Sequence, residues 1–163
     1  MGLDSYIGQY GRRIYGLCRH LCADPDEADD LYQETWLRAL QHFDRYDKNR
    51  PFEPWLAKVC VNAYRSSLRR LRRGPPLLRG RGAEQEALLQ ALPAPERPDY
   101  GPLYEAIGRL PERLRLTLVL FYFRDMQVAS CAQVLGVPEG TVKSRLNKAR
   151  KLLKEALGHE ADL

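Results

Sequence analysis

The chain has few of the residues that build catalytic or metal centres. Its 163 residues include three histidines and four cysteines, and these are not arranged as the ligand pairs that complete a four-coordinate metal site. It also contains no glycine-rich phosphate loop and no nucleophile placed beside a base. We therefore do not expect an enzyme, and we expect no catalytic residue, metal or other cofactor.

The four cysteines, at positions 18, 22, 60 and 131, each occupy an apolar position of a helical pattern. Cys18 and Cys22 share one helix face, whereas His20 between them points elsewhere. We interpret all four as buried, reduced thiols that serve as small apolar side chains. A metal site at this pair is the less favoured alternative.

Long apolar runs are also lacking. No stretch approaches the length that spans a membrane, and the chain does not open with a secretory signal pattern. We expect a soluble, cytoplasmic protein without membrane insertion.

Charge is unevenly distributed along the chain. The net charge is +5, yet residues 1–47 contain five basic and nine acidic residues, and residues 48–73 contain eight basic and one acidic. A local basic patch favours binding of a charged polymer such as nucleic acid, while the acidic part meets a different partner.

The strongest motif lies in residues 126–157 and predicts two helices joined by a tight turn. Apolar residues recur at i, i+3, i+4 and i+7 over 128–135, and Gly136 ends that helix. A second, basic helix is expected from about Gly140, with the Thr141 hydroxyl as its cap. Its buried face is predicted to be Val142, Leu146, Ala149 and Leu153. This is the pattern of a helix-turn-helix, whose second helix enters the DNA major groove.

A further basic helix is expected at 55–73, after a polar loop at 44–54. Lys58, Asn62, Arg65 and Arg69 fall on one stripe of this helix. Asparagine can hydrogen-bond a base edge, and the cations can neutralise phosphate. A solvated basic face remains the alternative for this stripe.

Two helices are expected before that loop, at 5–22 and 25–43, with Asp24 as the cap of the second. Asp30, Gln33 and Glu34 lie at i, i+3 and i+4 on the outer face of this second helix. From spacing alone, a solvated acidic helix start is the simpler interpretation.

Four motifs, in this order, resemble extracytoplasmic-function RNA polymerase sigma factors of the sigma-70 family. They are D-L-Y-Q-E at 30–34, F-x-x-W-L-x-K-V-x-x-N at 52–62, L-P-E-R-L-R at 110–115 and G-T-V-K-S-R-L-x-x-A-R at 140–150. The resemblance implies an all-α fold of two small helical domains. Residues 1–73 would be a region 2-like domain and 102–163 a region 4-like helix-turn-helix domain. The proline- and glycine-rich segment 74–101 would be a flexible linker spanning roughly 30 Å.

The resemblance also implies the function and the partners. Such a protein binds core RNA polymerase and directs promoter-specific transcription initiation, reading the −35 and −10 elements and aiding promoter opening. Its partners would be the polymerase β′ clamp helices and β flap, promoter DNA and a possible anti-sigma factor.

Each interface receives a set of residues from this resemblance. The polymerase set is Asp30, Gln33 and Glu34; the −10 set is Lys48, Asn49, Arg50, Trp55, Lys58, Asn62, Arg65 and Arg69; the −35 set is Thr141, Lys143, Ser144, Arg145 and Lys148.

Two other functions were weighed. A stand-alone helix-turn-helix regulator explains residues 126–157 but neither the acidic face nor the second basic helix. A nucleic-acid-processing protein would need a catalytic acidic or metal cluster, which the sequence lacks. We expect the free chain to be compact with its basic helices partly masked, or else held by a partner inserted between its domains.

Overall fold

The computed structural model describes residues 2–22, 24–73, 92 and 101–158, with only the backbone at 71–73. Its helices are α1 (Leu3–Leu21), α2 (Pro25–His42), α3 (Phe52–Arg73), α5 (Gly101–Gly108), α6 (Glu112–Tyr122), α7 (Val128–Leu135) and α8 (Glu139–Leu157), with a short 3₁₀ turn, η1, at Phe43–Arg45. These described residues form no strand. The all-α prediction is confirmed.

Helices α1, α2 and α3 pack around one apolar centre in which Trp36, Leu17 and Leu56 are fully buried. The start of α2 is the one the sequence predicts. Pro25 occupies its first turn, and the Asp24 carboxylate accepts a hydrogen bond from the Asp26 backbone N–H at 3.0 Å.

Helix α3 begins three residues earlier than expected, at Phe52 rather than Trp55. Phe52 is buried and belongs to the core, so the chain becomes helical as soon as this ring is packed. Pro54 then lies in the first turn, where a missing N–H removes no intrahelical hydrogen bond.

Helices α5 to α8 build the second unit. Helix α7 has the predicted bounds and ends at Gly136, whose φ of 69° lies in the left-handed region that favours glycine. The predicted buried face of α8, namely Val142, Leu146, Ala149 and Leu153, is confirmed.

The predicted Thr141 cap is wrong. Helix α8 begins at Glu139 and has no side-chain cap. The Thr141 backbone N–H donates to the Pro138 carbonyl at 3.0 Å, so Thr141 already belongs to the first turn. Pro138 starts the helix because its fixed φ is compatible with the extended entry.

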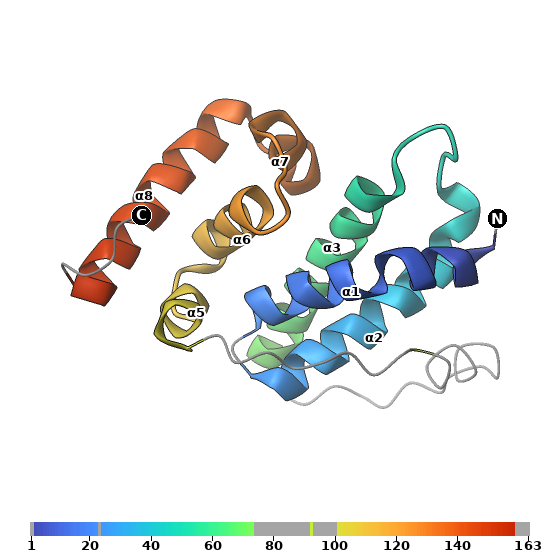
Figure 1. The fold of residues 1–163 in the computed structure, drawn as a ribbon, viewed down its shortest axis with the longest axis horizontal. Helices are drawn as coiled ribbons and strands as arrows, with labels where there is room; N and C mark the ends of the chain where they lie inside the picture. Colours follow the sequence, from blue (N-terminus) through green and yellow to red (C-terminus); the bar gives the residue numbers. More distant parts are fainter. Residues whose placement is uncertain (1, 23, 74–91, 93–100, 159–163) are drawn as a thin grey trace.

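The two units lie against each other. Helix α6 packs on α8 and also on α1, and α3 contacts α7. In Figure 1, α6 lies between α8 and the α1–α3 bundle. Apart from Leu92 and Gly101, the predicted linker lies outside the described residues, so its bounds and those of the domains remain predictions.

All four cysteines are buried free thiols, as predicted. Burial is the main cause that raises the pKa of Cys22 to about 12 and that of Cys131 to about 11. They are therefore protonated, weakly reactive core residues at neutral pH.

Candidate nucleic-acid interface

The acidic face of α2 is accessible. Asp30 and Gln33 are exposed, and Glu34 is half-buried because it pairs with Arg38 at 3.0 Å. All three residues of the polymerase set line a groove of about 400 Å³ between α2 and α3. The walls of this groove include Leu31 and Leu68. The structure thus places these three side chains together beside a partly apolar surface.

The basic stripe of α3 is mostly open to solvent. Lys58, Asn62 and Arg69 are exposed. Arg65 is half-buried, and its guanidinium lies 4.0 Å from the Glu112 carboxylate at the start of α6. Three of the four residues can therefore meet a ligand directly, whereas Arg65 is held by the second unit.

A cluster of aromatic rings supports the loop before α3. Tyr6 of α1 stacks on Phe52 with centroids 4.0 Å apart, and Tyr46 lies 5.1 Å from the half-buried Trp55 ring. The Tyr46 hydroxyl donates to the Arg50 carbonyl, which fastens the loop to the cluster. Unstacked bases bind to aromatic and cationic surfaces of this kind.

The loop itself carries the predicted basic and amide side chains. Lys48, Asn49 and Arg50 are all exposed, and the Lys48 ammonium lies 5.9 Å from the centre of the Phe43 ring. Sequence reasoning did not assign Tyr6 or Tyr46 to this site, although the aromatic spacing in α1 was a signal that could have found Tyr6.

Helix α8 presents the −35 set unevenly. Lys143, Ser144 and Lys148 are exposed, and Thr141 is half-buried. Arg145 is half-buried as well. Burial is the largest cause that lowers its pKa, followed by the guanidiniums of Arg113 and Arg65. One cation of the α8 set therefore lies near one cation of the α3 set.

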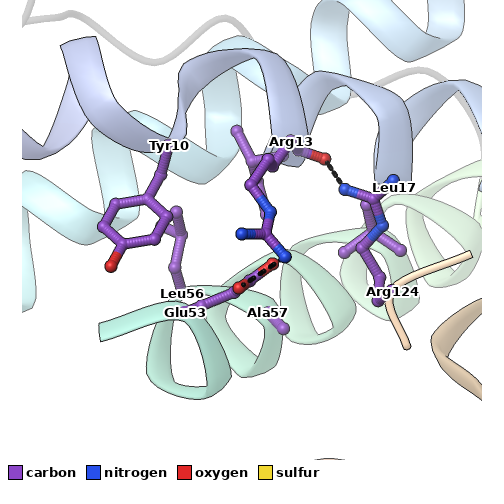
Figure 2. Close-up of a pocket in the computed structure, with 8 residues that line it drawn as sticks. Tyr10, Arg13, Leu17, Glu53, Leu56, Ala57 and Arg124 are labelled. Carbon is purple, nitrogen blue, oxygen red and sulfur yellow. Dashed lines mark hydrogen bonds and ion pairs between the residues drawn. The ribbon is translucent and has the colours of Figure 1, made fainter. Parts of the chain in front are cut away.

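Sequence reasoning missed the seam between the two units. Figure 2 shows Arg124, which follows α6, donating to the Arg13 carbonyl of α1 next to the 3.1 Å ion pair of Arg13 with Glu53. The cavity at this point has a volume of about 10 Å³. That volume suffices for about one water molecule, so the seam is closely packed.

Two searches of the described residues found nothing. They contain no group of His, Cys, Asp and Glu side chains able to hold a metal ion. Over the same ranges, every helix is too short or too polar to cross a bilayer.

Comparison with known proteins identifies the family. The family described as Sigma-70 region 2 matches residues 6–74, and Sigma-70, region 4 matches residues 100–153. The ECF RNA polymerase sigma factor SigM of Mycobacterium tuberculosis (strain ATCC 25618 / H37Rv) is 30% identical over 164 residues, covering 96% of this chain and 77% of the relative. The chain belongs to the extracytoplasmic-function (ECF) group of the sigma-70 family.

Other sigma factors agree. The ECF sigma factor SigW of Bacillus subtilis (strain 168) is 29% identical over 161 residues, covering 91% of this chain and 84% of the relative. The fold is that of the sigma factor RpoE of Bartonella quintana, solved with the anti-sigma factor NepR. That match has a TM-score of 0.74, 19% identity and 98% coverage of both chains. CnrH, solved with the cytosolic domain of CnrY, matches with a TM-score of 0.65, 23% identity and coverage of 94% of this chain and 86% of that one.

This ECF protein is therefore an alternative sigma factor that directs transcription initiation. Sigma factors as a family are not enzymes. The stand-alone regulator is not favoured, because its single helix-turn-helix would leave the region 2 match unexplained.

Proposed function

We propose that this sigma factor binds core RNA polymerase in the cytoplasm through the face formed by Asp30, Gln33 and Glu34. Its contact there is with the β′ clamp helices, and region 4 contacts the β flap. The observation that carries the proposal is the position of these three residues on one side of the α2–α3 groove. An acidic rim over apolar walls suits a helical partner with basic side chains.

The loop before α3 and the exposed part of its stripe hold the opened −10 strand. The loop supplies Lys48, Asn49 and Arg50, and Trp55 supplies a half-buried ring beside them. Lys58, Asn62 and Arg69 continue the surface along α3. This combination of cations, amides and an aromatic ring fits single-stranded DNA better than a duplex groove.

Helix α8 reads the −35 element in the major groove. Its apolar stripe is buried in region 4, which leaves Lys143, Ser144 and Lys148 on the outside. Arg145 joins them as a base or phosphate contact, with Thr141 near the start of the helix.

An anti-sigma factor is a further partner in this proposal. The two solved proteins of similar fold were crystallised with an anti-sigma factor, NepR, and with the cytosolic domain of CnrY. A protein of that class would bind this chain in competition with polymerase.

The polymerase contact can be tested with two variants of equal charge change. Asp30→Lys should weaken binding to purified core polymerase by about tenfold or more, as expected for a central interface residue. Asp4→Lys, at an exposed position on α1, is the matched control and should bind as the wild type does. Equal affinities of the two variants in a titration with labelled core enzyme would refute the assignment, provided that their circular dichroism matches the wild type.

A further inference from the structure

The proposed DNA contacts impose a distance that this conformation does not meet. The −35 and −10 elements lie about 25 base pairs apart, which is roughly 85 Å of B-form duplex. In the structure, Arg145 of the −35 set and Arg65 of the −10 set are near enough for one to lower the pKa of the other. The conformation described here therefore cannot hold both promoter elements.

A ring sandwich at the seam holds the two domains in this conformation. The His20 ring of α1 stacks on Phe123 with centroids 4.0 Å apart and on Tyr104 of α5 with centroids 5.0 Å apart. His20 is buried, and its two partners are half-buried. Separating the domains would expose all three rings to water, at a cost in hydrophobic free energy.

Two arginines of region 4 bind the backbone of α1. Arg124 donates to the Arg13 carbonyl and lies over Gly16, where a Cβ would come within 3.1 Å of its guanidinium. Arg115 donates to the Leu21 carbonyl at 3.2 Å. Leu21 is the last residue of α1, so Arg115 satisfies a carbonyl at the negative end of the helix.

Region 2 returns contacts to Arg115 and to the start of α6. The Arg115 guanidinium lies 5.7 Å from the centre of the Tyr64 ring, and Arg65 pairs with Glu112 at 4.0 Å. These contacts come from α3, so both α1 and α3 grip region 4.

We propose that His20, Tyr104, Phe123, Arg115 and Arg124 form a latch that closes region 4 onto region 2 and holds Arg65 and Arg145 away from promoter DNA. The proposal rests on the DNA roles given above to these last two residues. Asp30 and Gln33 stay exposed in the closed chain. Polymerase can therefore bind first, and opening of the latch accompanies that step. The segment 74–100 permits this, because a chain of that length can extend over roughly 95 Å.

The test uses Phe123→Ala and Arg124→Ala in the full-length chain. Each should increase the radius of gyration measured by small-angle scattering. Each should also tighten binding to a short fluorescein-labelled duplex of mixed sequence by about fivefold or more, the scale of a typical coupling between sites. The matched controls are Tyr122→Ala and Arg109→Ala, at exposed positions next to the same helix, and should change neither quantity.

Two results would overturn the latch. One is an unchanged radius of gyration for both latch variants when circular dichroism shows that they are folded. The other is expansion without tighter duplex binding, which would refute the masking of Arg65 and Arg145. Core polymerase binding measured on the same variants separates this from a failure of the proposed function, since it depends on Asp30, Gln33 and Glu34 and not on the latch.

Discussion

The two candidate DNA surfaces of this sigma factor are built in different ways. In region 4 a single helix, α8, carries both the buried stripe of Val142 and Leu146 and the exposed cations Lys143 and Lys148. In region 2 the surface needs a loop supported by rings from α1, the segment after α2, and α3. Reading a duplex groove requires one helix, whereas holding an unstacked base requires a pocket assembled from distant segments.

The comparison can be broken most strongly through the two cores. Trp36→Ala removes a fully buried ring from region 2 and should cost about 3–5 kcal/mol of unfolding free energy there. Leu146→Ala should cost about 2–5 kcal/mol in region 4. Both tryptophans of the chain, Trp36 and Trp55, lie in region 2. Tryptophan fluorescence during urea unfolding therefore follows region 2 alone, and circular dichroism follows both.

The two domains should respond separately. Leu146→Ala should shift part of the circular dichroism transition and move the fluorescence midpoint by less than about 1 kcal/mol in free energy. A full shift of the fluorescence transition by Leu146→Ala would mean that the two regions share one cooperative core.

Binding to DNA sharpens the comparison at the level of single side chains. Arg145→Gln should cost the holoenzyme about 1–3 kcal/mol on duplex DNA that contains its −35 element. Asn62→Ala should instead weaken binding to the single-stranded −10 sequence. Fluorescence anisotropy on the two probes, taken from a promoter selected with wild-type holoenzyme, gives both values. Loss of Asn62→Ala binding through weaker polymerase affinity would remove the role given to Asn62.

Acid should open the seam between the regions. Burial, then Arg124, lowers the pKa of His20 from 6.5 to about 4; Arg19 acts in the same direction, and a hydrogen bond to the Gly16 backbone opposes them. The other titratable group facing this ring is the Tyr104 hydroxyl, which is neutral at these pH values. A lowered pKa in the closed state means that its stabilisation is complete above pH 6.5 and is lost as the pH falls towards 4.

With a pKa of 6.5 in the opened chain, closure should weaken by about 2 kcal/mol at pH 5. Small-angle scattering between pH 7.5 and pH 5, written as about 7.5 and about 5 on the buffer scale, should therefore show expansion. His20→Phe keeps an aromatic ring in the sandwich and should abolish this response. An equal expansion of the His20→Phe chain would assign the pH dependence to other groups.

The smallest expected effect contrasts two glycines within the helix-turn-helix. Gly136→Ala should destabilise region 4 by about 1 kcal/mol, because the φ of 69° strains any side chain although the space around it is open. Gly140→Ala should stabilise it by roughly 0.5–1 kcal/mol, since Gly140 is helical and its Cβ would meet nothing within 4 Å. Thermal unfolding followed by circular dichroism measures both, and equal signs would contradict the argument.

The sequence was sufficient wherever the signal is local. The bounds of α7, its end at Gly136 and the buried face of α8 follow from helical periodicity and one glycine. The wrong Thr141 cap shows the limit of such reasoning, since Pro138 allowed the helix to begin two residues before that threonine.

The seam could not be predicted because its partners are far apart in the chain. His20 is an ordinary residue of α1 until Phe123, more than a hundred positions later, stacks on it. The same holds for Arg115 on the Leu21 carbonyl. No periodicity or spacing encodes a contact between two domains, so only the three-dimensional structure reveals it.

The central claim is that the free chain is closed and that polymerase opens it, and one distance tests this directly. Cysteines introduced at the exposed positions Gln41 and Lys151 would carry a donor and an acceptor dye, since the native cysteines are buried. We expect high energy transfer in the free chain and a large loss of transfer when core polymerase is added, before any DNA is present. The same transfer efficiency with and without polymerase would contradict the account.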